Sequence, residues 1–192
     1  MTTVQPIRLI VLSSVSGGGK NTVLQKLIGH YPDKLCVAVT ATSRAPRTGE
    51  KDGVHYHFLQ RQKFLSMIDE SGFIEHAEVH GNLYGIPKTE IENARASGKT
   101  LLLNIDVQGM ATLKEKFEGQ VLTIFLLPPD EKTWEHRLRS RGTESDEDIA
   151  LRLRLGKEEL ARASQFDYQV VNDDLNRCIK DLEEILRNLR IL

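Results

Sequence analysis

Hydrophobic residues along this chain gather in short unbroken runs that alternate with helical stripes. Four runs have the length and composition of buried strands: Ile7–Ser13, Thr100–Ile105, Val121–Leu127 and the shorter Tyr168–Val171. Glycines follow the first run, and two prolines stop the third, as expected at the ends of strands. The pattern therefore predicts a sheet whose central strands are buried on both faces.

Apolar residues spaced three and four apart predict helices beside these strands. One helix covers Lys20–Ile28, directly after the first strand, and Gly29 can end it. The last helix carries one continuous stripe, formed by Leu175, Cys178, Ile179, Leu182, Ile185, Leu186 and Leu189. Such alternation favours an α/β fold with a parallel central sheet, in which ligands bind at the carboxyl ends of the strands.

Two segments interrupt the alternation and are interpreted as insertions. The first, Thr40–Gly85, has strand-like pieces at Val54–Leu59 and Gly72–Val79 around a short helix at Lys63–Ser71. A helix over Pro87–Ser97 follows, with proline in its first turn and glycine behind it.

The second insertion, Asp130–Ala163, is highly charged. Within it, Ser145 and Asp148 have the spacing of a capping box, which marks the start of a helix. We find no internal repeat and no low-complexity segment.

Composition limits the class of protein without naming it. A length of 192 residues suits one compact domain, and 40% hydrophobic and 28% charged residues are ordinary for a soluble globular protein. A net charge of −1 gives no reason to expect a nucleic-acid partner. Monomeric and homo-oligomeric states both stay open.

The cysteines and the amino-terminal segment indicate a location. Cys36 and Cys178 lie far apart without a CxxC pair, which fits a reduced compartment and no metal framework. The apolar run Ile7–Leu12 is interrupted by Arg8 and is too short for a signal or membrane segment. We therefore expect a cytoplasmic protein without a membrane partner.

The turn after the first strand, SSVSGGGKNT, has the form of a phosphate-binding loop. The pattern G-x-x-x-x-G-K-[ST] is matched at Gly19 and Lys20, but Ser14 replaces the first glycine and Asn21 the hydroxyl residue. Backbone N–H groups at a helix start can cradle an anion, and the lysine can reach the outer phosphates. The alternative is a plain glycine turn, and the strand before it and the helix after it favour the phosphate site. The expected ATP-binding residues here are Ser14, Val15, Ser16, Gly17, Gly18, Gly19, Lys20, Asn21 and Thr22.

A second motif changes the picture. TATSRAPRTGEKDGVHYHF, at Thr40–Phe58, resembles the GMP-binding signature of guanylate kinases, S-x-T-[TS]-R-x-P-R-x-G-E-x-x-G-x-x-Y-x-F. The resemblance continues in order at GFIEHAEVHGNLYG (Gly72–Gly85), DVQG (Asp106–Gly109), RLRSRGTES (Arg137–Ser145) and VVND (Val170–Asp173), and covers essentially the whole chain. Nucleoside monophosphate kinases often have G-K-G-T in the phosphate loop, so Thr22 supplies a hydroxyl one residue after Asn21.

The resemblance implies a three-layer P-loop kinase that transfers a phosphoryl group from MgATP to GMP or dGMP, with Mg²⁺ as cofactor and ATP as co-substrate. It divides the chain into a core (1–39, 91–129 and 161–192), a GMP-binding insertion at about 40–90 and a lid at about 130–160.

Roles for the GMP side follow from the resemblance. Arg44, Arg47, Tyr56 and Tyr84 are expected to hold the phosphate of GMP. Glu75 is expected to select guanine, because a carboxylate accepts its adjacent N1–H and N2–H₂ donors. The remaining expected GMP-binding residues are Thr40, Ile86, Asn104 and Asp106. Without the resemblance, the tyrosines would be expected in half-buried packing roles and Glu75 on the surface.

Catalysis is expected to need little beyond position and charge, so no histidine is assigned as a base. The expected catalytic residues are Lys20, Arg44, Arg137, Arg141 and Arg152. The lid arginines can meet the phosphates only if the lid closes.

The remaining expectations concern the metal, the adenine side and four histidines. Asp106 is expected to hold Mg²⁺ through water, with Thr22 or Asn21 as further ligands, and Asn172 to lie on the adenine side. His55, His57, His76 and His80 are expected on the faces of a small sheet.

Two departures from the family pattern lie on the GMP side. Ile86 replaces the usual serine or threonine after Y-G, and Asn104 replaces the first aspartate of L-D-x-D, so weaker or less selective GMP binding is expected. The alternatives are a guanylate-kinase-like binding module with weak or no catalysis, or a kinase for another nucleoside monophosphate. A GTPase is disfavoured, because the sequence has no N-K-x-D motif.

Overall fold

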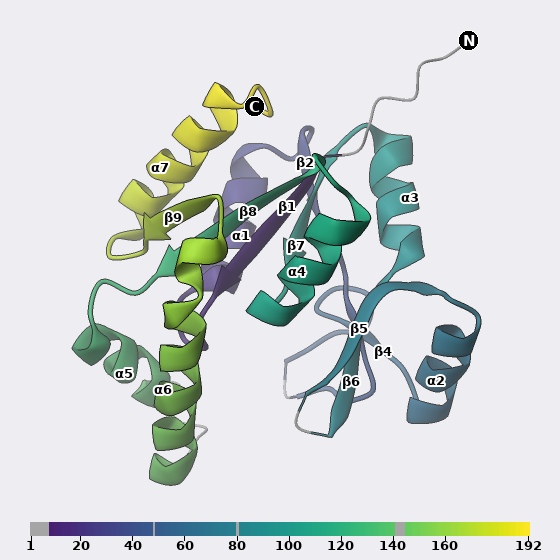
Figure 1. Ribbon diagram of the computed structural model, residues 1–192, viewed down its shortest axis with the longest axis horizontal. Coiled ribbons are helices and arrows are strands. Elements are labelled where there is room, and N and C mark those ends of the chain that lie inside the picture. Colours follow the sequence, from purple (N-terminus) through teal and green to yellow (C-terminus); the bar gives the residue numbers. More distant parts are fainter. Residues whose placement is uncertain (1–7, 48, 80, 141–144) are drawn as a thin grey trace.

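The computed structural model describes residues 8–47, 49–79, 81–140 and 145–192, which form two β-sheets (Figure 1). The larger sheet has five strands in the order β2-β7-β1-β8-β9, and every neighbouring pair is parallel. Its strands are β1 (Leu9–Ser14), β2 (Leu35–Val37), β7 (Thr100–Asn104), β8 (Val121–Leu127) and β9 (Tyr168–Val171). The predicted α/β fold with a parallel central sheet is confirmed.

Strand β1 lies at the centre of this sheet, and all of its residues are buried. Leu9 and Val11 face one hydrophobic cluster, whereas Ile10 and Leu12 face the other, as the alternation of a strand requires. Helices α1 (Lys20–His30) and α7 (Leu175–Asn188) cover one face, and α3 (Lys88–Ser97) and α4 (Val107–Lys116) cover the other. Within the described ranges, no helix is long and apolar enough to cross a membrane.

The smaller sheet has four strands in the order β4-β3-β6-β5 and falls within the first predicted insertion. Its elements are β3 (Ala41–Thr42), β4 (His57–Phe58), α2 (Arg61–Asp69), β5 (Phe73–Val79) and β6 (Asn82–Pro87). Phe64 and Phe73 stack with ring centroids 4.4 Å apart in a hydrophobic cluster separate from the main core. Ile74 and Ile86 belong to the main cluster. The small sheet therefore has its own core and is joined to the large one through β5 and β6.

Two helices in the second predicted insertion pack on the glycine-rich loop that follows β1. They are α5 (Glu131–Arg139) and α6 (Asp146–Ala161), and the predicted capping box of Ser145 and Asp148 starts α6. Trp134 of α5 is 1% exposed, and its indole Nε1 donates to the carbonyl oxygen of Ser16 at 2.7 Å. The indole also lies against Gly156 of α6, where a β-carbon would overlap the ring. One side chain thus joins both helices to the loop.

The first helix was predicted to end at Gly29, and this is wrong because α1 continues to His30. The helix stops at Tyr31, since the residue before a proline disfavours helical backbone. Its N–H still reaches the carbonyl oxygens of Leu27 and Ile28, at 3.2 and 3.1 Å.

The strand predicted at Val54–Leu59 is wrong except for His57 and Phe58. A turn comes first, in which the N–H groups of Val54 and His55 both donate to the carbonyl oxygen of Lys51, at 3.3 and 3.1 Å. Gly53 allows this turn because its φ is 70°, in the left-handed region.

Pro87 does not stand in the first turn of α3, as predicted, but ends β6 with extended backbone (φ −60°, ψ 140°). Of the four histidines expected on the small sheet, His57 and His76 lie on its strands and His55 lies in the turn. His80 is outside the described residues.

We expect Gly156→Ala to lower the free energy of unfolding by about 1–3 kcal/mol, because its methyl group overlaps Trp134 in a packed core. Gly29→Ala is the matched control. No atom lies within 4 Å of the β-carbon it would add to α1, so it should stabilise the protein by about 0.5–1 kcal/mol. Urea denaturation measures both, and equal effects would show that Trp134 is not tightly packed against α6.

Candidate active site

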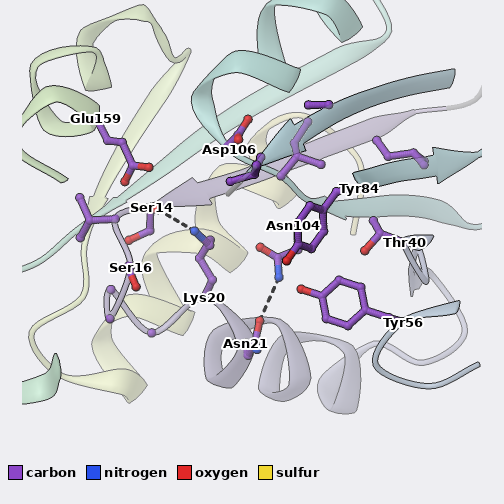
Figure 2. Close-up of a pocket in the computed structure, with 18 of the residues that line it drawn as sticks. Ser14, Ser16, Lys20, Asn21, Thr40, Tyr56, Tyr84, Asn104, Asp106 and Glu159 are labelled. Carbon is purple, nitrogen blue, oxygen red and sulfur yellow. Dashed lines mark hydrogen bonds between the residues drawn. The ribbon is translucent and has the colours of Figure 1, made fainter. Parts of the chain in front are cut away.

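A cleft of about 470 Å³ lies between the two sheets, at the carboxyl ends of β1 and β7 (Figure 2). The loop Ser14–Thr22 lines one side, and residues of the small sheet line the other. Of the residues predicted for binding or catalysis, it also brings together Thr40, Tyr56, Glu75, Tyr84, Ile86, Asn104, Asp106 and Arg152. Parallel strands end at one edge of a sheet, which is why residues distant in sequence meet here.

The glycine-rich loop has the backbone of an anion nest. Gly17 and Gly19 have φ angles of 84° and 91°, which other residues rarely adopt, and Gly19 is the N-cap of α1. No side chain caps this helix, and its first residues, Lys20–Thr22, line the cleft, so the partial positive charge of the helix amino terminus lies beside it. Lys20 begins the helix, and its Nζ donates to the carbonyl oxygen of Ser14 at 2.6 Å.

Ser14 is compatible with this loop although the pattern asks for glycine. Within the described residues, only Ser71 and Arg190 have positive φ among non-glycine residues, so Ser14 stays in ordinary extended backbone at the end of β1. Its side chain lies against Gly18, where a β-carbon would overlap the hydroxyl oxygen. Ser14 Oγ is buried and has no hydrogen-bond partner in the described part of the chain, which is unusual for a buried polar atom.

Side chains from distant elements hold the carbonyl side of the loop. Asn172, after β9, donates from Nδ2 to the carbonyl oxygen of Gly18 at 2.8 Å, and Arg152 of α6 donates to Ser16 Oγ at 2.9 Å. Trp134 binds the Ser16 carbonyl oxygen from α5. These bonds fix the shape of the loop, and within it the N–H of Gly18 donates to the carbonyl oxygen of Val15 at 3.0 Å.

Two departures from the family pattern contact each other. Asn104, at the end of β7, donates from Nδ2 to Oδ1 of Asn21 on α1 at 2.9 Å (Figure 2). The sequence placed them 83 residues apart, and nothing in their spacing signals the pair. An aspartate at position 104 has no N–H to donate, so it would keep this contact only if Asn21 turned its amide and became the donor.

Glu75 is the acidic group of the small sheet that faces the cleft. It lies on β5 opposite Ile86 of β6. Its carboxyl group lies close to Gly109, where an added β-carbon would come within 3.3 Å of Cδ of Glu75. Burial, reinforced by the charge of Asp106 and opposed by Lys116, raises the pKa of Glu75 to about 7. Glu75 is therefore a partly buried, poorly compensated carboxyl group and not an ordinary surface glutamate.

Aromatic and apolar side chains complete this side. Tyr56 and Tyr84 meet edge to face with ring centroids 6.2 Å apart, and Figure 2 shows both turned into the cleft with Thr40. Ile86 is 1% exposed and belongs to the main core while it lines the cleft. Packing into the core therefore accounts for isoleucine where the family has a hydroxyl residue.

Arg44 does not line the cleft but is held beside it by Glu50. The guanidinium donates to both carboxylate oxygens at 2.8 and 2.9 Å and lies 5.3 Å from the ring centroid of Tyr56. This pairing raises the pKa of Arg44 and lowers the pKa of Glu50 to about 2. Glu50 was missed as a functional candidate, although the E of the signature R-x-G-E was its signal.

The other predicted arginines are distributed around the cleft. Arg47 is exposed, and its backbone N–H donates to Glu50 at 2.7 Å. Arg137 lies behind the loop, where it donates to the carbonyl oxygens of Asn172 and Asp173 at 2.9 and 3.3 Å. Neither lines the cleft, and Arg141 is outside the described residues.

Glu159 of α6 lines the cleft and was not predicted. Burial raises its pKa, as does the charge of Asp106, whereas Lys20 lowers it. Its only sequence signal is its position seven residues after Arg152, which puts both on the same face of a helix.

Comparison with known proteins identifies the family. A guanylate kinase family model matches residues 6–189. The chain is 42% identical over 178 residues to a guanylate kinase from Clostridium perfringens, covering 93% of this chain and 82% of that protein. It is 43% identical over 179 residues to one from Synechocystis sp., covering 93% of each. The crystal structure of guanylate kinase from Anaplasma phagocytophilum matches with a TM-score of 0.76 and 33% identity, over 96% of this chain and 87% of that one. The expected resemblance is confirmed, and the chain belongs to the guanylate kinase family.

Proposed function

We propose that this protein transfers the γ-phosphoryl group of MgATP to GMP or dGMP and so acts in purine nucleotide metabolism. The observation that carries the proposal is the cleft itself, which joins a phosphate-binding loop on the large sheet to Glu75 on the small one. A nucleotide phosphate on one side and a purine base on the other would bring donor and acceptor together between the sheets. Such a transfer needs position and charge more than a general base.

The small sheet supplies the GMP side. Glu75 accepts hydrogen bonds from N1–H and N2–H₂ of guanine when it is ionised, and Thr40 adds a hydroxyl near the base. Tyr56 and Tyr84 present phenol groups to the phosphate, and Arg44, already oriented by Glu50, adds a guanidinium fork. Adenine offers no matching pair of donors, so Glu75 would be left buried without a partner.

The glycine-rich loop supplies the ATP side. Its N–H groups bind the phosphates, and the buried hydroxyl of Ser14 gains the partner that it lacks. Lys20 leaves the Ser14 carbonyl oxygen to reach the transferred phosphate, where its charge stabilises the transition state. Arg152 is already at the loop, and Asn172 takes the adenine side. Arg137, which donates to the carbonyl oxygen of Asn172, would neutralise charge on the transferred group once the lid closes.

The residues present fit Mg²⁺. Among the described residues no three histidine, cysteine or acidic side chains gather as a metal site, but Mg²⁺ needs only one or two carboxylates besides water and substrate phosphates. Asp106, through water, with Asn21 or Thr22 offers such oxygen ligands in the cleft. When bound, the ion would neutralise charge that develops on the transferred group.

We further propose the division into a core (1–39, 91–129, 161–192), a GMP-binding insertion (about 40–90) and a lid (about 130–160). The separate cluster of Phe64 and Phe73 supports the first insertion. A cytoplasmic location is proposed from Cys36 and Cys178, which are both free thiols.

We expect ADP release from ATP and Mg²⁺ with GMP and dGMP, but not with AMP, UMP or CMP. In Glu75→Gln, kcat/KM for GMP should fall about 100-fold or more, because one of the two acceptors becomes a donor. Glu78→Gln is the control, since Glu78 lies on the same strand but pairs with Arg61 at the surface. Turnover with another nucleoside monophosphate would show that GMP is not the specific acceptor. GMP binding without turnover would favour a guanylate-kinase-like binding module.

Glu75→Gln should also change the free energy of unfolding, by an amount that depends on pH. Because the pKa of Glu75 is raised to about 7 in the folded protein, the stability that its protonated form gives is present below about pH 4.5 and is lost as pH rises through 7. Glu75→Gln should therefore exceed the parent by about 1–2 kcal/mol at pH 8 and by little at pH 5. Denaturation curves at the two pH values measure this, and a difference independent of pH would contradict it.

We expect closure when both substrates bind, because Arg47 and Arg137 lie outside the cleft that they are proposed to serve. Small-angle scattering should give a smaller radius of gyration with GMP and a non-hydrolysable ATP analogue than without ligands. Either ligand alone is the control. Identical curves in all states would mean that the arginines reach the substrates without movement of the chain.

A further inference from the structure

Glu159 is the acidic side chain in the cleft to which none of the roles above applies. It projects from α6 toward the side of the cleft that contains Ser14, Lys20 and Asp106 (Figure 2). Arg152, on the same face of α6, already contacts the glycine-rich loop through Ser16. The helix therefore presents one cation and one anion to the place where the phosphates of ATP would bind.

The anion is unexpected there. A phosphate site is normally lined by N–H groups and cations, and a carboxylate repels a bound polyphosphate. Asp106 and Glu159 both line this cleft, against the ammonium group of Lys20. The three groups lie close enough for Lys20 and Asp106 to shift the pKa of Glu159 in opposite directions. The two carboxylates thus share one electrostatic environment.

A divalent cation reverses the effect of these carboxylates. Mg²⁺ in phosphate-transfer sites keeps several waters and binds one or two carboxylates together with substrate phosphates. With the ion present, each carboxylate attracts the metal–nucleotide complex, directly or through its waters. Without the ion, each one repels the phosphates. Glu159 reaches the cleft from α6, whereas Asp106 reaches it from the segment between β7 and α4.

We propose that Glu159 is a specificity-determining residue that makes the cleft select the Mg²⁺ complex of ATP over metal-free ATP. The inference rests on the proposed function only in taking ATP as the ligand of the glycine-rich loop. It does not depend on which nucleotide accepts the phosphoryl group. Glu159 acts by its charge, in concert with Asp106, and Arg152 on the same helix face binds phosphate oxygens.

The test is calorimetric titration of ATP into the protein without any acceptor, once with excess Mg²⁺ and once with EDTA. The parent protein should bind ATP much more tightly with Mg²⁺. In Glu159→Gln the Kd with EDTA should fall and the Kd with Mg²⁺ should rise, so that the preference for the metal complex drops about tenfold or more. Glu158→Gln is the matched control, because Glu158 precedes Glu159 on α6 but is exposed and does not line the cleft.

Glu159→Asp separates charge from packing. It keeps the negative charge while changing the shape, so it should retain most of the preference, and thermal melts of all variants establish that they are folded. Equal shifts of both Kd values in Glu159→Gln, or none, would overturn the inference and leave Glu159 a structural residue.

The outcomes separate this inference from the proposed function. Loss of the Mg²⁺ preference in a protein that phosphorylates no nucleotide would overturn the function and support the role of Glu159. Normal GMP turnover by the parent protein, with the Mg²⁺ preference unchanged in Glu159→Gln, would support the proposed function and overturn the role of Glu159. If the parent protein bound ATP under neither condition, the inference would fall together with the assignment of the phosphate loop.

Discussion

The rest of the structure depends on one constraint, which is that the loop after β1 must keep its N–H groups for a ligand. A short loop with outward N–H groups turns its carbonyl oxygens inward, and buried carbonyl oxygens need partners. Trp134 supplies one to Ser16 and Asn172 supplies one to Gly18. Both side chains come from segments far away in the sequence, so the tertiary fold of the carboxyl-terminal half completes a loop that the first twenty residues begin.

This arrangement also explains where the helices of the second insertion can lie. Trp134 is buried between Gly17 and Gly156, so α5 and α6 are anchored to the loop. From that anchor, Arg137 reaches the carbonyl oxygens after β9, whereas Arg152 and Glu159 reach the cleft. At Gly156 the indole occupies the space that a side chain would need, whereas at Gly17 this space is taken by Leu138. The packing of Trp134 therefore also places Arg152 and Glu159 at the cleft.

On the GMP side, Glu75 is poorly compensated in the absence of ligand, which costs stability but serves recognition of the base. Glu75 is partly buried near Asp106, and Lys116 compensates it incompletely, so the free protein holds its proton to about pH 7. A site that is poorly satisfied without ligand is well suited to discriminate between bases, because the correct base removes the penalty and a wrong base does not. Arg44 differs, since Glu50 pairs with it through both carboxylate oxygens in the absence of substrate.

Much of the fold could be predicted from the chain itself. The runs at Val121–Leu127 and Tyr168–Val171 are β8 and β9 with the predicted bounds. Strand β8 is buried over Thr123–Leu126, as a continuous apolar run suggests, whereas β9 is an edge strand on which only Val170 is buried. Strands β2, β3 and β6 and helices α4 and α5 escaped prediction. They have too few residues or too mixed a pattern for periodicity to reveal, and neighbouring strands hold them in place.

The sequence by itself determined the parallel sheet, the glycine-rich loop and the residue types of the family, since these depend on local periodicity and on motifs. Only the tertiary structure decided that Asn104 binds Asn21, that Glu159 enters the cleft and that Arg47 and Arg137 lie outside it. These are contacts and positions set by how distant segments pack. No local pattern encodes them, because the same helix or strand sequence could point either side chain toward a ligand or toward solvent.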